Sequence, residues 1–376
     1  MDYWMCLVYF LLGALFFFGA RSFGRGQWNG EYTSLKETKA LQGAAALMVA
    51  FHHMAQKTCA SWVDRGHIVH GLDVFLQAGF LMVAVFFFSS GLGLYRSLKT
   101  KPDYLKGFFR RRILPMVIAY YLSEYVYLAV RCLYVGLRTG RWMNAGTVLL
   151  SLTGVRLVNA NAWYLAVIPF FYLAFWLAFR FCKREGTAIL WVTAAALGYT
   201  ALGLTNHRDD IVWLWGDWWY NSVILFPLGL FFGKYEQKVT GAWTKGYWLW
   251  LALCLGAEAL LWSRYGAFRG DLARTAAQWL IAAAFVMFWF LLRMKIRIGN
   301  RALAFLGGIG LEFYLMHGLF VDLFGYSFMD TPYSLYIRSL PLYIAAVLAS
   351  SVAASLLFRL LWKGTVKLLL RPKPKT

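Results

Sequence analysis

The chain of 376 residues carries little charge and very little acid. Only 15% of its residues are charged, against roughly 25% in soluble globular domains, and 60% are hydrophobic. So many apolar side chains cannot be buried inside a water-soluble core of this length, which excludes a soluble enzyme. Disorder is excluded as well, because disordered segments are poor in aromatic residues and 19% of this chain is aromatic.

Cysteines and acidic residues are both scarce. The five cysteines are scattered and never form a CxxC pair, so we expect neither a disulfide framework nor a metal site from them. The 17 acidic residues face 38 lysines and arginines, a net charge of +21. No nucleic-acid-binding module accompanies this charge, so we expect no nucleic-acid partner. The basic loops are instead typical of membrane orientation and of contact with anionic lipids.

Long apolar runs are what the chain has in abundance. Each is roughly 17–23 residues long, enough for an α-helix to cross about 30 Å of hydrocarbon. A β-barrel would show short alternating segments instead. The sequence therefore predicts an all-α polytopic membrane protein with about eleven transmembrane helices. The predicted spans are residues 4–20, 38–55, 74–95, 113–135, 161–181, 187–204, 216–233, 246–263, 275–293, 302–321 and 341–362.

Lysine and arginine are concentrated in alternate loops between these spans. The positive-inside rule places the basic loops in the cytoplasm, with the N-terminus outside and the C-terminus inside. We divide the chain into an extra N-terminal helix with a cytoplasmic loop (1–35), a main membrane domain (36–365) and a basic cytoplasmic tail (366–376).

All six histidines fall in the outer half of the membrane or in outer loops under this topology. His52 and His53 lie within the apolar span 38–55, where an imidazole is costly and by default indicates function. At about 100° per residue, His53 shares a helical stripe with Lys39 and Gln42, whereas His52 lies about 80° from Gln42. The alternative is an interfacial histidine that bonds to a neighbouring helix.

A second polar stretch connects the third predicted span to the fourth. Ser90 and Gly91 are small enough for a ligand to approach the backbone closely, although helix packing alone explains many such clusters. Arg110, Arg111 and Arg112 follow, and guanidinium groups bind phosphate bidentately. This pattern predicts an anion site at the cytoplasmic end, while the topology rule alone also accounts for arginines there.

Four short motifs follow one another along the chain: Phe86-Phe87-x-x-Ser90-Gly91, Arg112-x-x-Pro115, Asn161-x-Trp163-Tyr164 and Leu311-Glu312-Phe313-Tyr314-Leu315-Met316-His317. In this order they resemble the acyltransferase 3 family of integral-membrane acyltransferases, in particular a branch common in Gram-positive anaerobes. Two positions depart from the family pattern. Gln42 stands where the signature helix has an arginine eleven residues before its histidine, and Gly310 stands where the last motif has serine. Lys39 could substitute for that arginine.

The resemblance implies a ten-helix core preceded by one extra helix, in a bacterial cell membrane. It implies transfer of an acyl group, expected to be acetyl, from cytoplasmic acyl-CoA to a hydroxyl of a cell-surface glycan or an exported small molecule. Acyl-CoA would be a co-substrate, with no bound cofactor. We expect His53, or else His52, to be the general base. The expected donor residues are Lys39, Gln42, Ser90, Gly91, Arg110, Arg111 and Arg112, and the expected acceptor or pocket residues are Trp163, Tyr164, Glu312, Tyr314 and His317.

Other interpretations stay open. A transporter or lipid-linked-substrate flippase would also be polytopic and aromatic, but would favour broken helices and repeated halves, which the sequence does not show. His317-x4-Asp322 matches a glycerolipid acyltransferase motif that works in a different fold. His67, His70 and Asp73 have metal-ligand residue types, but a solvated loop is favoured. Outer-loop aromatics predict an interfacial belt, with a sugar-stacking platform as the alternative: Trp213, Trp215, Trp218, Trp219 and Tyr220.

Overall fold

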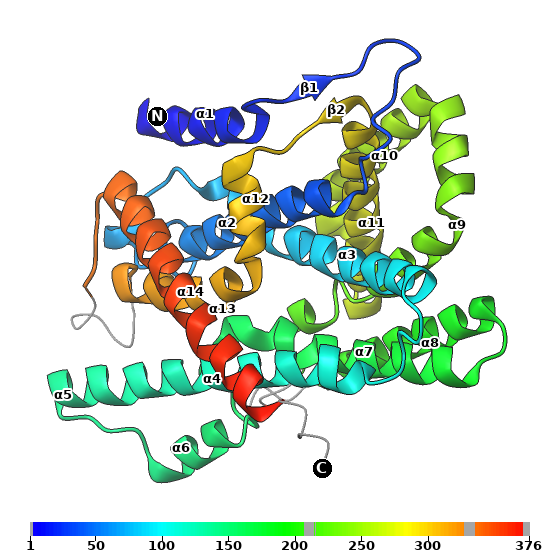
Figure 1. Cartoon of the computed structure of the whole chain (residues 1–376). Helices are drawn as coiled ribbons and strands as arrows, with labels where there is room; N and C mark the ends of the chain where they lie inside the picture. The colour runs from blue at the N-terminus through cyan, green and yellow to red at the C-terminus, as the bar shows by residue number, and fades with distance from the viewer. Residues whose placement is uncertain (1–2, 207–213, 215, 327–334, 371–376) are drawn as a thin grey trace, which may run out of the picture.

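The computed structural model describes residues 3–206, 214, 216–326 and 335–370. Within them the protein is predominantly helical with almost no sheet, as the composition predicts (Figure 1). The helices are α1 (Tyr3–Phe17), α2 (Leu35–Thr58), α3 (Gly79–Thr100), α4 (Leu114–Val130), α5 (Gly136–Thr139), α6 (Ala145–Leu152), α7 (Trp163–Phe181), α8 (Glu185–Thr205), α9 (Leu225–Lys245), α10 (Tyr247–Arg264), α11 (Asp271–Lys295), α12 (Arg301–Gly308), α13 (Gly310–Phe324) and α14 (Leu340–Leu369).

Short elements connect these helices. Two π-helical turns, Phe109–Ile113 and Arg131–Val135, extend α4 at both ends into one helical stretch of 31 residues that ends with α5. Strands β1 (Arg21–Ser22) and β2 (Ile296–Arg297) pair antiparallel and fasten the segment after α1 to the connection between α11 and α12.

Within the described residues, six helical stretches are long and apolar enough to cross a membrane, and counting each of two bent helix pairs as one span raises the number to eight. The protein is therefore a polytopic helical membrane protein. The predicted count of about eleven spans, their orientation and the division at residues 36 and 366 stay predictions. Helix α14 continues through residue 366 to Leu369, so no break in structure marks the start of the predicted tail.

The two least regular predicted spans, 216–233 and 302–321, differ from single straight helices. The first begins as a helix only at Leu225 and continues to Lys245, where α10 follows at a bend of 97°. The second is broken at Ile309 into α12 and α13, which meet at 83°. The expectation of no broken helices is therefore wrong. Glycines flank the break at Ile309, and glycine weakens helix continuity.

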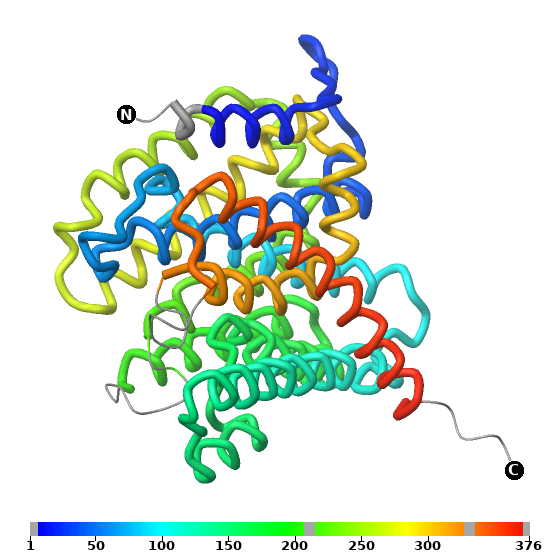
Figure 2. The backbone as a smooth tube through the Cα atoms, turned by 90° about the vertical axis from the view of Figure 1, so that its left-hand side faces the viewer, coloured from blue at the N-terminus to red at the C-terminus, as the bar shows by residue number. Residues whose placement is uncertain are grey.

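Helices α2 and α3 lie side by side across the centre of the molecule (Figure 1). Glycines let them pack closely against their other neighbours. A Cβ on Gly43 of α2 would lie 2.0 Å from the Leu303 carbonyl oxygen of α12, and one on Gly91 of α3 would lie 2.1 Å from the Phe226 carbonyl oxygen of α9. Such small residues are what membrane helices use for close crossings. Helix α14 runs obliquely over α13 and also contacts α4 (Figure 2).

Candidate active site

Two of the cavities among the helices contain predicted site residues. The larger, which we term the basic cavity, has a volume of about 590 Å³. Among the described residues its lining includes four cations and no acid, so it is electropositive. It also includes small and hydroxyl side chains from α3, such as Ser89, Ser90 and Gly93. The four cations are Lys39, Arg96, Lys101 and Arg112.

The smaller cavity, which we term the histidine cavity, has a volume of about 240 Å³. His52 and His53 line it, together with the amides Gln56, Asn161 and Asn221. Aromatic side chains complete its wall: Phe80, Trp163, Trp218 and Tyr314. It thus combines basic nitrogens with hydrogen-bonding amides and flat apolar faces.

Helix α2 passes both cavities. Thr38, Lys39 and Gln42 line the basic cavity, and the histidine cavity follows further along the helix. The α2 residues at the histidine cavity are Val49, His52, His53 and Gln56. Their spacing of three, four and seven residues is that of one helix face. The predicted stripe from Lys39 through Gln42 to His53 therefore exists in the structure. The angle of about 80° between His52 and Gln42 does not exclude His52 from the cavity, because this helix face is wide enough for both imidazoles.

Three other helices also pass both cavities. On α3, Gly79, Phe80 and Val83 line the histidine cavity, and the stretch from Phe86 to Ser97 contributes to the basic cavity. On α7, Trp163 lines the histidine cavity and Tyr164 lines the basic cavity. Tyr314 of α13 lines both cavities. The two cavities are therefore arranged end to end along one set of helices. About 16 Å of α2 separates Gln42 from His53, at a rise of about 1.5 Å per residue.

Hydrogen bonds decide which nitrogen of each imidazole can act as a base. The Nδ1 atom of His53 lies 2.9 Å from Gln56 Oε1, and that of His52 lies 2.9 Å from the Phe75 carbonyl oxygen. An oxygen of this kind only accepts, so each Nδ1 carries the proton and donates it. The Nε2 atoms of both rings are therefore left with lone pairs. These are the atoms that can take a proton from a substrate.

His317 lies beside this pair. Its ring centroid is 5.2 Å from that of His53, and its Nδ1 donates to the Phe313 carbonyl oxygen at 3.0 Å. The side chain is fully buried, and its Nε2 has no hydrogen-bond partner among the described residues. The structure thus brings His317, from the last motif, next to the adjacent pair His52 and His53 of α2. His317 does not itself line either cavity within the described part of the chain.

Several predicted donor residues meet at the basic cavity. Lys39, Gln42, Ser90 and Arg112 all line it. Lys39 Nζ donates to the Gly307 carbonyl oxygen at 3.2 Å, at the end of α12 where the helix break leaves carbonyls unpaired. Ser90 Oγ lies 3.2 Å from the hydroxyl of Tyr164. Lys39 therefore lines the same cavity as Gln42, the position where the family pattern has an arginine, and lies one helical turn before it.

Three other predicted donor residues lie elsewhere. Gly91 faces α9 and lets the two helices cross closely, so it is a packing residue and not part of the channel wall. Arg111 donates through Nη2 to the backbone carbonyls of Tyr104 and Lys106, so it stabilises the loop before α4. Arg110 is exposed and, like Arg111, is absent from the cavity lining. Consecutive residues on a helix point in different directions, so only Arg112 of the three faces inward.

The predicted pocket residues divide in the same way. Trp163, Tyr164 and Tyr314 line the cavities. Glu312 does not, because its carboxylate turns toward α14, where it accepts a hydrogen bond from Trp362 Nε1 at 3.0 Å and lies 3.8 Å from Arg359 Nε. It is a buried structural acid rather than a pocket residue.

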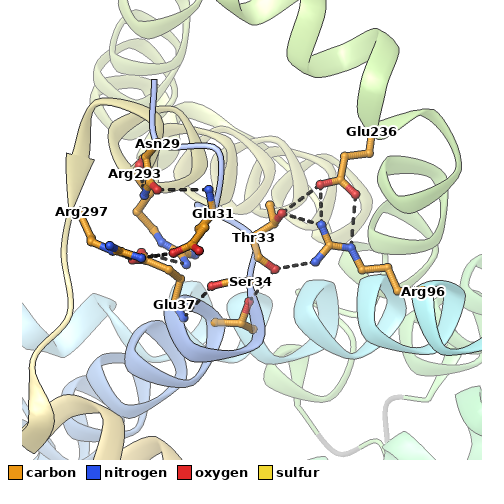
Figure 3. Close-up of polar contacts among 10 residues, drawn as sticks. Asn29, Glu31, Thr33, Ser34, Glu37, Arg96, Glu236, Arg293 and Arg297 are labelled. Carbon is orange, nitrogen blue, oxygen red and sulfur yellow. Dashed lines mark hydrogen bonds and ion pairs between the residues drawn. The ribbon is translucent and has the colours of Figure 1, made fainter. Parts of the chain in front are cut away.

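Arg96 is a cavity residue that the sequence argument missed. It bonds to the carboxylate of Glu236 and to Thr33, and both Arg96 and Thr33 line the basic cavity (Figure 3). A signal existed, because Arg96 follows Ser89 by seven residues on the same face of α3. Gln56 was missed too, although it follows His53 by three residues, which is the spacing for side-chain contact on a helix.

Next to Arg96 lies a second ionic cluster (Figure 3). The carboxylate of Glu37 in α2 accepts from Arg297 Nε at 2.8 Å and lies 3.5 Å from Arg293 Nη2. Glu37 and Arg293 are almost completely buried, with 4% and 1% of their side chains exposed. Arg293 Nε and Nη1 have no hydrogen-bond partner among the described residues. Glu37 is therefore the carboxylate that compensates this buried charge.

The weaker sequence candidates separate into ordinary contacts. Asp322 pairs with Lys57 at 2.9 Å and not with His317. In the loop between α2 and α3, His67 pairs with Asp64, and His70 with Asp73. No group of three or more histidine, cysteine or acidic residues within the described residues is arranged to hold a metal ion.

The aromatic residues of the loop between α8 and α9, among those described, divide between core and cavity. Trp219 and Tyr220 are buried, with Trp219 packed on Trp163, so the predicted interfacial belt is wrong for both. Trp218 lines the histidine cavity, where a sugar face could stack. Trp213 and Trp215 lie outside the described residues.

Comparison with known proteins identifies the family. The family model of the acyltransferase 3 type, described as an acyltransferase domain, matches residues 36–360, more than four fifths of the chain. The chain belongs to the acyltransferase 3 family. It is therefore a membrane acyltransferase, as the motifs and their order predict. No curated protein and no solved structure matches it.

Proposed function

We propose that the protein transfers a short acyl group, acetyl first of all, from acyl-CoA to a hydroxyl of a cell-surface glycan or exported small molecule in a bacterial cell membrane. The observation that carries this proposal is the end-to-end arrangement of an electropositive cavity and a histidine cavity along four shared helices. One end suits an anionic donor, and the other suits activation of a hydroxyl.

The donor's phosphates would bind at the basic cavity. Lys39, Lys101 and Arg112 supply cationic donors there, while the charge of Arg96 is already paired with Glu236. Arg112 is held by the hydroxyl of Tyr104, which its Nε contacts at 3.1 Å. Polar side chains such as Ser89 and Ser90 line the basic cavity and suit the amide-rich arm of the acyl-CoA donor.

The chemistry would take place in the histidine cavity. His53 Nε2 takes the proton of the acceptor hydroxyl as its oxygen attacks the thioester carbon. The C–O bond forms, the C–S bond breaks, and the thiolate leaves with the proton that His53 returns. The amide of Asn161 lines the same cavity and is a donor suited to the developing oxyanion. Gln56 holds the His53 ring in the required tautomer.

Thiol release from acetyl-CoA by the purified protein tests the proposal. We expect His53→Ala to reduce transfer by about 10²-fold or more, the usual contribution of a general base. His70→Ala is the matched control, because His70 lies in an exposed loop and pairs with Asp73. Equal turnover in the wild type and the His53 variant would remove His53 from the mechanism.

Arg112→Gln separates donor binding from chemistry. We expect a higher KM for acetyl-CoA with a smaller change in kcat, because the lost contact is to a remote part of the donor. Arg110→Gln is the control, since Arg110 does not line the cavity. An unchanged KM in the Arg112 variant would place the donor elsewhere.

Transport of a lipid-linked or small-molecule substrate is the second candidate. The broken pair α12 and α13 favours it, because discontinuous helices frame many transporter sites and Gly307 and Gly310 line the basic cavity. Flux of a labelled substrate across a proteoliposome without thiol release would support transport over acyl transfer.

A further inference from the structure

Tyr314 lies between the two cavities. Among the described residues it alone lines both of them. Its ring centroid lies 6.2 Å from that of Phe86 and 5.8 Å from that of Tyr164, and the latter two lie 6.0 Å apart. These three rings form a compact triangle, which we term the aromatic septum.

The order of residues along the helices places the septum across the route between the cavities. On α3, Phe86 lines the basic cavity and comes three residues after Val83, which lines the histidine cavity. On α7, Tyr164 lines the basic cavity and comes one residue after Trp163, which lines the histidine cavity. Since Tyr314 is the one described residue that lines both cavities, the direct route from the basic cavity to His53 runs past its ring.

The septum is tightly held. Tyr164 is fixed through its hydroxyl to Ser90 at 3.2 Å, and Tyr314 has only 4% of its surface exposed. Beyond it, the histidine cavity offers about 240 Å³, which has to hold both the acyl group and the attacking hydroxyl. Pockets for drug-sized ligands are usually about 300–1,000 Å³. Little space remains for a long acyl chain.

We propose that Tyr314 determines the length of the acyl chain that the enzyme transfers and restricts it to short chains. This inference rests on the proposed function and adds the residue that selects the donor. The ring of Tyr314 forms part of the wall of the histidine cavity, so it limits the space there for additional methylene groups. Removing the ring would join the two cavities and make that space available to longer chains.

Thiol release from acetyl-, butyryl- and hexanoyl-CoA, with glucose as the hydroxyl probe and water as the alternative acceptor, tests the inference. We expect the wild type to favour acetyl-CoA, and Tyr314→Ala to raise the hexanoyl-to-acetyl ratio of kcat/KM by about tenfold or more. Tyr314→Phe keeps the ring, so its ratio should remain that of the wild type. Tyr314→Leu is the second variant if the alanine variant does not fold.

Phe320→Ala on the same helix is the positional control, because Phe320 lines neither cavity within the described residues. Active Tyr314 variants with the wild-type chain-length preference would overturn the inference and leave the proposed function intact. A wild type that already turns over hexanoyl-CoA as fast as acetyl-CoA would overturn it too. Absence of thiol release by the wild type from every donor would contradict the proposed function itself and, with it, the inference.

Discussion

Replacing Glu37 by Gln tests the ionic cluster that fixes the start of α2. The carboxylate lies between Arg293, which is 1% exposed, and Arg297, whose side chain is 33% exposed (Figure 3). Removing the negative charge leaves the Arg293 guanidinium buried without a compensating carboxylate. Breaking a buried pair in this way costs about 3–5 kcal/mol. Arg297 can instead be solvated and contributes little to the loss.

The matched control is Glu31→Gln. Among the described residues the Glu31 carboxylate pairs with Arg297 alone and its side chain is 67% exposed, so this ion pair contributes about 0–1 kcal/mol. The assay measures the apparent Tm of the detergent-solubilised protein as the temperature at which half of it no longer remains monodisperse after heating. We expect Glu37→Gln to lower Tm by about 10 °C, from about 2–4 °C per kcal/mol in larger domains. Glu31→Gln should change Tm by no more than about 4 °C.

A double variant separates lost charge compensation from lost packing. Arg293→Met in the Glu37→Gln background removes the uncompensated charge and keeps an apolar chain of similar length. Because replacing both partners of a buried pair is often nearly neutral, it should recover most of the lost stability. Equal Tm values for Glu37→Gln and Glu31→Gln would refute the reasoning. A double variant less stable than Glu37→Gln would refute it as well.

Two further predictions concern α3 and the segment between α2 and α3. Gly91→Ala should destabilise the fold by about 1–3 kcal/mol, measured as a lower Tm, because its Cβ would lie 2.1 Å from the Phe226 carbonyl oxygen. Gly93→Ala is the control, since a Cβ on Gly93 meets nothing within 4 Å. A Gly93→Ala variant as unstable as Gly91→Ala would contradict this prediction. Burial raises the pKa of Asp73, but the Gly71 N–H and the His70 ring that bond its carboxylate together hold that pKa below its usual 3.8. The ionised carboxylate therefore stabilises the fold above about pH 4, and this contribution is lost as the pH falls through the lowered pKa. The wild type should therefore have a higher Tm than Asp73→Asn near neutral pH, and the two Tm values should become equal in stronger acid. A Tm difference that stayed constant with pH would contradict a stabilising role of the ionised Asp73 carboxylate.

Local and compositional properties could be predicted from the sequence. Apolar runs form helices because a backbone in lipid must satisfy its hydrogen bonds internally. The stripe of Lys39, Gln42 and His53 on α2 follows from helical periodicity, which needs no partner helix. The motifs in their chain order also pointed to the family that the comparison shows.

Tertiary structure decided which of the predicted residues meet. Gly91 packs against α9 while its neighbour Ser90 lines the basic cavity, and of three consecutive arginines only Arg112 does, because these outcomes depend on where a partner helix crosses. Glu37 and Arg293 are 256 residues apart in sequence, so no local pattern could pair them. The break at Ile309 is likewise a tertiary feature. There Lys39 and Arg359 donate to the carbonyls of Gly307 and Gly308, which satisfies helix-end acceptors that an isolated helix would leave unpaired.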